Sequence, residues 1–432
     1  YHVGNPSPAE DHVIELDNSN AAGNDSSFND TAPTDTHFTV SGGGSVNGNG
    51  MTYVAYLFAS DAGGFGDDED ENIIKCGSYT GNGSTDGPTV TLGFEPQWIL
   101  IKGATSGAAY DWYLVDNMRG ITTGGNDPLL WPNKSDAEDT LNNIISVTAT
   151  GFKLEGTGYG FNGSGQTYIY IAIRRPMKTP TAGTEVFNIA TALGTNPAFV
   201  SGFVTDMGFN VNKTAASILF NESRLQGGQY LNTRSTASEV AEASRSWDYM
   251  NGMIDSQTAS TNNIGYMFKR ASGFMDVVAY TTPGSTFQVV PHNLTVAPEL
   301  IIVKRRNGIV DWGVQYVPFG SNSALYLNSD AAVGVGGWSY FFTSVTAASI
   351  TATTSVSGYT AGNYIAYLFA TLAGISKVGS YTGTAADLNV DCGFTAGARF
   401  ILIKRTDSTG DWYVYDSLRG ISAGNDPYLL MN

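Results

Sequence analysis

The densest group of potential metal ligands in the chain is a run of five acidic residues at positions 67–71. Carboxylate oxygens are the ligands that calcium prefers, so Asp67, Asp68 and Asp70 are the candidates for a calcium site. The run lacks the spaced ligands and the glycine that an EF-hand loop requires. Its composition favours a solvated, self-repelling linker instead, and no other metal or cofactor is expected.

An aspartate followed by a tryptophan occurs three times, at 111–112, 311–312 and 411–412. The face of an indole ring suits the apolar face of a sugar, which would make these residues a glycan-binding site. Core positions recur in every unit of a repeat protein, however, so the regular recurrence favours a structural role. We therefore predict a core that recurs in successive repeat units and contains Trp112, Trp312, Trp412, Phe94 and Phe394.

The remaining residues with a potential for chemistry are two tryptophans and two aspartate–arginine pairs. Trp131 and Trp338 do not recur, so they are candidates for contact with a surface glycan. Asp-x-x-Arg at 116–119 and again at 416–419 is interpreted as an ion pair within a turn, although paired carboxylates for glycoside hydrolysis stay an alternative. The sequence holds no Gly-x-Ser-x-Gly elbow, no His-x-x-x-His pair and no phosphate-binding glycine loop, so we predict no enzymatic activity.

Composition and charge exclude several classes of protein. The 432 residues include 22 basic and 39 acidic side chains, and this net charge of −17 opposes binding to nucleic acid. No apolar run approaches about 18 residues, so no membrane span is expected. The two cysteines, Cys76 and Cys392, are too few for a disulfide framework or a zinc site. Few charged residues, 52 glycines and many aromatic residues favour strands and turns over helices.

The chain contains internal repeats with a period of about one hundred residues. Gly-Ser-Tyr-Thr-Gly at 77–81 returns at 379–383. In both places Gly-Phe, a strand ending in lysine, Asp-Trp and Asp-x-x-Arg-Gly follow in that order. A third copy carries the lysine-ended strand at 300–304 and Asp-Trp at 311–312. The copy expected at 179–270 lacks both features and is degenerate.

An apolar closing strand marks the end of each unit, and such strands occur at 53–58, 168–173, 264–268 and 364–369. These marks divide the chain into five parts. They are the C-terminal part of a unit at 1–72, complete units at 73–178 and 271–374, the degenerate unit at 179–270, and the N-terminal part of a unit at 375–432. We expect the first and last parts to be pieces of units in a longer chain.

Alternation of apolar and polar residues, as at 38–40, 152–154 and 350–352, predicts half-buried antiparallel strands. Short strands between glycine-rich turns predict an all-β fold of tandem antiparallel β-sandwich or jelly-roll-like units. A short helix is expected only at 238–243. The strands at 99–101 and 364–369 are apolar on both faces, so we expect a loop, a neighbouring unit or another subunit to cover their outer face.

The order of motifs resembles an uncharacterised tandem-repeat domain found in virion and tail-fibre-like proteins of tailed bacteriophages, especially marine ones. The resemblance covers most of the chain and is clearest at 73–178 and 375–432. It implies a structural virion protein without enzymatic activity, such as a tail fibre, a spike or a capsid fibre. It also implies a location on the virion surface, outside the cell, and a homo-oligomer, with a trimer favoured. Other virion proteins and a host surface polysaccharide are the further partners that it implies.

Two alternatives remain open at this stage. One is a bacterial surface adhesin or filament subunit, in which the part at 375–432 of one subunit pairs with the part at 1–72 of the next by strand complementation. Both parts would supply the segment that follows Asp-Trp in a complete unit, and this overlap argues mildly against the pairing. The other alternative is a polysaccharide depolymerase.

Overall fold

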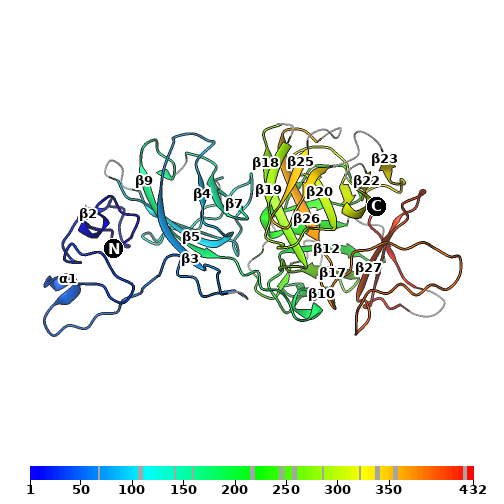
Figure 1. The fold of residues 1–432 in the computed structure, drawn as a ribbon, viewed down its shortest axis with the longest axis horizontal. Coiled ribbons are helices and arrows are strands. Elements are labelled where there is room, and N and C mark those ends of the chain that lie inside the picture. The colour runs from blue at the N-terminus through cyan, green and yellow to red at the C-terminus, as the bar shows by residue number, and fades with distance from the viewer. Residues whose placement is uncertain are drawn as a thin grey trace. The chain divides into compact units, whose positions relative to one another are not determined.

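The computed structural model describes residues 1–66, 69–105, 110–140, 143–157, 160–214, 219–242, 247, 249–254, 260–284, 287–320, 323–335, 341–353, 359–421 and 426–432. The chain forms two compact bodies, an N-terminal body at Tyr1–Arg175 and a C-terminal body at Pro176–Asn432 (Figure 1). Both consist of short antiparallel strands, and the four-residue α1 (Gly44–Asn47) is the α-helix among the described residues. The predicted all-β fold is confirmed.

A two-layer β-sandwich makes up most of the N-terminal body. Its larger sheet has the order β3-β9-β5-β6 and the smaller one β4-β8-β7. The bounds are β3 (Ile74–Thr80), β4 (Thr89–Thr91), β5 (Pro96–Gly103), β6 (Trp112–Asp116), β7 (Ile145–Thr148), β8 (Gly151–Leu154) and β9 (Thr167–Arg174). Phe152 of the smaller sheet packs edge-on against Tyr79 and Tyr170 of the larger one, so the core lies between the two layers.

The first 72 residues hold little regular structure. Among the described residues there, β1 (His12–Val13) and β2 (Gly23–Asn24) are the strands that pair, and Phe65 and Glu71 form an isolated bridge. The strands predicted at 38–40 and 53–58 are wrong, because neither segment belongs to a strand. A closing strand lies between two other strands of its unit, as β9 lies between β3 and β5. Among the described residues at 1–72 neither segment has a neighbouring strand with which to form a ladder.

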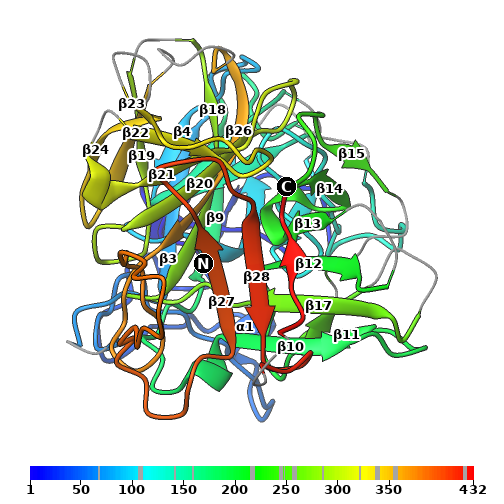
Figure 2. The same cartoon turned by 90° about the vertical axis from the view of Figure 1, so that its right-hand side faces the viewer.

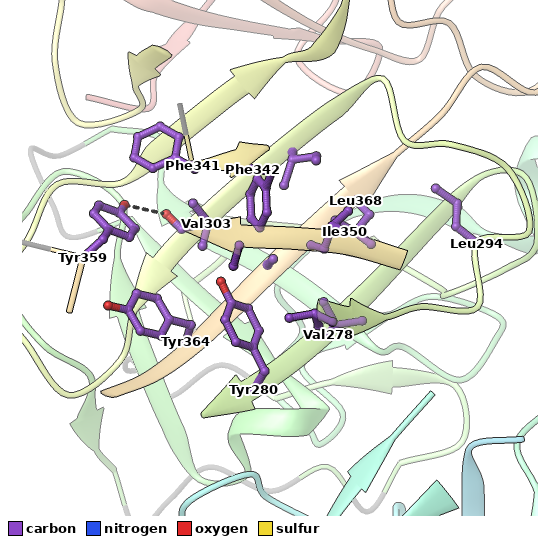
Figure 3. Packing of buried hydrophobic residues seen from close by; sticks show 14 of the residues in the cluster. Val278, Tyr280, Leu294, Val303, Phe341, Phe342, Ile350, Tyr359, Tyr364 and Leu368 are labelled. Carbon is purple, nitrogen blue, oxygen red and sulfur yellow. Dashed lines mark hydrogen bonds between the residues drawn. The ribbon is translucent and has the colours of Figure 1, made fainter. Parts of the chain in front are cut away.

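The segment 271–374 of the C-terminal body is a second sandwich. Its sheets have the orders β18-β26-β20-β21-β22-β23 and β19-β25-β24. The bounds are β18 (Met275–Thr282), β19 (Phe287–Pro291), β20 (Leu300–Arg305), β21 (Gly313–Tyr316), β22 (Ser323–Tyr326), β23 (Gly334–Val335), β24 (Phe342–Val345), β25 (Ser349–Thr353) and β26 (Gly362–Phe369). Figure 3 shows its aromatic core, in which Tyr280 stacks on Tyr364 at 5.4 Å.

That core is close-packed. The Tyr359 hydroxyl donates a hydrogen bond to the Val303 carbonyl across it (Figure 3). A cavity of about 10 Å³ remains between Tyr280, Phe341 and Tyr364, which has room for roughly one water molecule. Between the described residues, this cavity is too small for an organic ligand.

The segment 179–270 has the same succession of strands in its main sheet, which has the order β10-β17-β12-β13-β14-β15, and adds the pair β11-β16. The bounds are β10 (Phe187–Thr191), β11 (Phe199–Val200), β12 (Met207–Asn212), β13 (Phe220–Ser223), β14 (Gln229–Asn232), β15 (Val240–Ala241), β16 (Gly252–Met253) and β17 (Asn263–Phe268). The helix predicted at 238–243 is wrong, because Val240 and Ala241 form an edge strand paired with β14. Pairing with a neighbouring strand has outweighed local helix propensity there.

The last described strands are β27 (Phe400–Lys404), β28 (Trp412–Asp416) and β29 (Leu429–Leu430), which form one sheet in that order (Figure 2). The residues at 375–399 precede this sheet and form no strand. In the two sandwiches the strand corresponding to β27 has a closing strand at its other edge. The sheet at 400–430 is thus the first half of a sandwich sheet.

Neighbouring segments cover the outer faces of the two strands that are apolar on both sides, as the sequence predicts. Leu100 of β5 packs together with Ile14 and Ala22 from the first 72 residues. On β26, the Tyr367 hydroxyl donates to Asn221 Oδ1 at 2.5 Å and lies 3.2 Å from Gln226 Oε1, and both residues belong to the segment 179–270. The larger sheets therefore face a core on one side and the preceding segment on the other.

Candidate functional site

Each tryptophan of the Asp-Trp motif joins its own unit to the preceding one. The indole Nε1 of Trp112 donates to the Glu15 carbonyl at 2.8 Å. Trp312 Nε1 donates to Asn232 O at 2.9 Å, and Trp412 Nε1 donates to Tyr326 O at 2.9 Å. The ring is buried in all three places. The same donor thus fastens three pairs of neighbouring segments, and we call these contacts the junctions.

An aspartate–asparagine pair holds each of these tryptophans in place. In the second junction Asn328 Nδ2 donates to Asp311 Oδ1 at 2.8 Å, while Asn328 Oδ1 accepts the Trp312 main-chain N–H at 2.8 Å. Asn133 makes the same two bonds in the first junction and Asn432 makes them in the third. The aspartate before each tryptophan therefore orients the asparagine that fixes the tryptophan main chain.

The lysine near the end of the strand before each Asp-Trp motif also takes part in the junction. Lys304 Nζ donates to the Val310 carbonyl at 2.5 Å and to the Thr236 carbonyl of the preceding unit at 2.8 Å. Lys404 Nζ likewise donates to Gly410 O and, at 2.8 Å, to Asp330 O of its preceding unit. In the first junction the described bond is the one from Lys102 to Tyr110 O. The main chain supplies every one of these acceptors, so the preceding unit is recognised by its backbone.

Burial changes the titration of these lysines. It lowers the pKa of Lys102 and of Lys304 from 10.5 to about 8, and it also lowers the pKa of Lys404. The negative charges of Asp111 and Asp311 oppose the shifts of Lys102 and Lys304. A neutral amine still has two N–H donors, which matches the two carbonyl acceptors of Lys304. The junction thus keeps its hydrogen bonds whether the amine is charged or neutral.

We expect the stability of the C-terminal body to rise between pH 8 and about 10. In that range Lys304 is still protonated in the unfolded chain but has lost its proton in the folded chain. The free energy of unfolding therefore increases with pH, by about 1 kcal/mol per pH unit. Denaturant unfolding at pH 7.5, 8.5 and 9.5 measures this slope. Lys304→Met removes the titrating group and should reduce the slope, and an equal slope in both proteins would contradict the assignment.

The degenerate unit at 179–270 lacks these donors. Val211 pairs with the closing strand β17 at the position where Lys304 pairs with the closing strand β26, so Val211 corresponds to the junction lysine. Extending the register of β12 and β13 by one residue places Leu219 at the tryptophan position. Both side chains are apolar and buried, so they donate to no carbonyl. The chain divides into its two bodies between Arg175 and Pro176, at the start of this unit.

A second contact fastens the last sheet to the segment 179–270. Asp416 is fully buried and accepts from the Tyr266 hydroxyl at 2.7 Å, from Arg419 Nε at 2.5 Å and from the Arg419 main-chain N–H at 2.9 Å. Burial raises the pKa of Tyr266, so its hydroxyl stays protonated and donates. The ring of Phe400 packs against those of Phe187, Phe209, Tyr266 and Phe268. The turn ion pair of the sequence analysis is present, and here it also binds a neighbouring unit.

One buried carboxyl group was not singled out by the sequence. Asp127 accepts the main-chain N–H groups of Thr122, Ile144 and Ile145, each at 2.9 Å. Burial raises its pKa from 3.8 to about 7, although the three donors oppose the shift. The carboxyl group ties two loops of the first sandwich together, and this arrangement is structural.

The predicted calcium candidates are not brought together as a described site. Asp67 and Asp68 lie outside the described residues, and Asp70 is exposed. The neighbouring Glu71 accepts from Arg174 NH2 at 2.6 Å, which ties the end of the run to β9. Within the described residues no group of three or more His, Cys, Asp or Glu side chains is placed to hold a metal ion.

The other predicted residues differ in their surroundings. Phe94 is buried in the first sandwich, whereas Phe394 is half-buried because the strands that would cover it are not formed in the last segment. Trp131 is half-buried, with the Lys134 ammonium 5.6 Å from its ring centre. Trp338 lies outside the described residues. No signal in the sequence pointed to the carbonyl acceptors of the junctions, because any residue type supplies a carbonyl.

Comparison with known families yields one match. A family model described as a domain of unknown function, DUF7483, matches residues 2–176 and 246–430. The unmatched stretch at 177–245 falls almost entirely within the degenerate unit at 179–270. No curated protein sequence matches the chain. No helix among the described residues has the length and apolar character needed to cross a membrane.

Proposed function

Because the chain belongs to the DUF7483 family, whose function is unknown, we propose from the chain's own features that it is a non-enzymatic structural protein of stacked β-sandwich units. The observation that carries the proposal is the junction, which occurs three times with the same donors. In an enzyme, conserved chemistry would gather at one place. Here the recurring polar groups hold one unit to the next, as in other repeat proteins.

Such a junction allows units to be added in series. The segments 271–374 and 375–432 each supply a lysine and a tryptophan toward the segment before them, which offers carbonyl groups in return. The length of the assembly then scales with the number of units. A surface with few charged groups and many short turns suits an appendage exposed outside the cell.

The resemblance to tail-fibre-like proteins gives the proposed setting. We place the protein in a virion of a tailed bacteriophage, as a fibre or spike of the tail or capsid. Its proposed partners are further copies of itself, with a trimer favoured, and other virion proteins. Loop tips that contact a host surface polysaccharide would add a role in attachment.

Immunogold electron microscopy of the native source material tests this setting. An antibody raised against residues 73–178 should place gold on projections of virus particles. The same antibody, incubated beforehand with the purified protein so that its binding sites are occupied, serves as the control. Gold on filaments of bacterial cells would overturn the virion proposal and favour a surface adhesin or filament subunit.

The absence of enzymatic activity has its own test. Incubation of the full chain with polysaccharides from the host surface should release no reducing sugar ends above a heat-inactivated control. Time-dependent release, abolished by Asp416→Asn or Asp116→Asn without loss of folding, would instead establish a depolymerase that uses the paired acidic residues.

A further inference from the structure

In each sandwich a buried side chain holds the start of an edge strand. In the first sandwich Asp127 Oδ2 accepts the main-chain N–H groups of Ile144 and Ile145, both at 2.9 Å, and Ile145 is the first residue of β7. β7 is an edge strand of the smaller sheet, whereas Asp127 lies in the loop that follows β6 of the larger one. Asp127 therefore ties the two layers of the sandwich together, and we call this tie the Asp127 contact.

The second sandwich makes the same kind of tie with a neutral side chain. Gln315 Oε1 accepts the main-chain N–H groups of Phe341 and Phe342 at 3.2 and 3.0 Å, and Gln315 Nε2 donates to the Phe342 carbonyl at 3.1 Å. Phe342 begins β24, which is an edge strand of its smaller sheet as β7 is in the first sandwich. The two sandwiches thus use a carboxyl group and an amide for one structural task.

The described partners of Asp127 include no cation. Its side chain is fully buried, and Oδ1 accepts the Thr122 main-chain N–H at 2.9 Å and lies 3.5 Å from the Thr122 hydroxyl. All of these partners are neutral, so ionisation of the carboxyl group places a charge in the interior without an opposite charge beside it. A buried charge of this kind is far more costly than a buried neutral group with the same hydrogen bonds.

The charged side chains of the surrounding segments are engaged in ion pairs of their own. Arg119 pairs with Asp116, and Lys153 lies 3.5 Å from Glu155. The pKa of Asp127 is set by burial, which raises it, and by its hydrogen-bond donors, which lower it. The charged residues on the turn before Asp127, on the segment before β7 and on β8 and its end are Asp116, Arg119, Glu138, Asp139, Lys153 and Glu155.

We infer that the Asp127 contact is controlled by protonation: it holds the start of β7 while the carboxyl group is neutral and releases it as that group ionises. A protonated carboxyl group gains an O–H donor and keeps acceptor capacity, so it retains the bonds from Ile144 and Ile145. Gln315 makes the corresponding tie without any charge. The inference rests on contacts within one sandwich, and it holds whether or not the protein is part of a virion.

The Asp127 contact should respond to pH between about 5 and 7. Burial raises the pKa of Asp127 from 3.8 to about 7 in the folded chain, whereas an opened carboxyl group meets water and titrates at its ordinary value. Between these two values the closed contact keeps a proton that the open one has lost. The contact is therefore firmest in acid, and its opening equilibrium increases by about tenfold for each pH unit as the pH rises toward 7.

Hydrogen exchange of the full chain between pH 5 and pH 8 tests this response. After correction for the intrinsic pH dependence of exchange, protection of the Ile144 and Ile145 amides should fall by about tenfold per pH unit and level off above pH 7. The Phe341 and Phe342 amides are the internal control in the same sample. They should show no such fall, because Gln315 does not titrate.

Two substitutions of the anchoring side chain test the cause. Asp127→Asn keeps a neutral acceptor of nearly the same shape, so protection at Ile144 and Ile145 should lose its dependence on pH. Gln315→Glu places a titrating carboxyl group at the matching site, so protection at Phe341 and Phe342 should now fall as the pH rises. The second variant leaves the first sandwich unchanged, so it decides the question even where Asp127→Asn disturbs folding.

Three results would overturn the inference. They are protection at Ile144 and Ile145 that stays constant in the wild-type chain, an equal fall in the Asp127→Asn variant, or protection at Phe341 and Phe342 that ignores pH in the Gln315→Glu variant. Protection that instead rises with pH in the wild-type chain would show that the ionised carboxylate holds the strand. The proposed direction of the control would then be wrong.

Discussion

Replacing Trp312 with alanine is expected to lower the free energy of unfolding of the C-terminal body by about 3–5 kcal/mol. The side chain is fully buried, stacks on Tyr367 with a centroid distance of 6.4 Å and donates to Asn232 O. Its removal leaves a large cavity between two units and an acceptor without its donor. Guanidinium unfolding measures the total loss, and hydrogen exchange at 229–232 and 313–316 reports whether the junction opens locally.

Trp312→Phe is the matched control for that change. It keeps an aromatic ring over Tyr367 but loses the indole N–H, so the expected loss is about 1–2 kcal/mol. A loss below about 1 kcal/mol in the alanine variant would contradict a role for Trp312 in joining the units. An equal loss in the two variants would assign the whole effect to the hydrogen bond.

Asp416→Ala is expected to cost about 3–5 kcal/mol, because it leaves the buried Arg419 guanidinium without its ion-pair partner and the Tyr266 hydroxyl without its acceptor. The consequence reaches beyond its own turn, since Tyr266 belongs to the segment 179–270. Hydrogen exchange should therefore accelerate in β17 as well as in β28. Faster exchange confined to 412–419 would contradict a role in joining the units.

The same turn in the N-terminal body supplies the control. Asp116 likewise accepts the main-chain N–H groups of Met118 and Arg119 and forms an ion pair with the Arg119 side chain. Here, however, the Asp116 side chain is 13% exposed and that of Arg119 is 22% exposed. Water therefore compensates part of the lost interaction, and Asp116→Ala should cost only about 1–2 kcal/mol. Similar costs at the two positions would mean that the turn, rather than the contact with Tyr266, determines the effect of Asp416.

Local sequence patterns predicted the strands wherever their partners lie within the same unit. The alternation at 152–154 and 350–352 became β8 and β25, since each lies between two other strands. The same kind of pattern failed at 53–58, because a strand requires neighbours that local sequence does not reveal. Recurrence of Asp-Trp indicated a structural role for the tryptophans but gave no hint of their indole bonds. Those bonds end on main-chain carbonyl groups of Glu15, Asn232 and Tyr326, which share no side-chain chemistry.

Those backbone acceptors have an evolutionary consequence. A contact that depends only on the path of the neighbouring main chain puts no demand on the identity of the residues along that path. Mutations can then accumulate in one unit without compensating changes in the next, as long as the fold persists. The segment 179–270 has diverged far from the others and still provides carbonyl acceptors for Trp312 and Lys304. The side-chain contacts between units, such as that of Tyr367 with Asn221, differ in this respect, because they require matched residues on both sides.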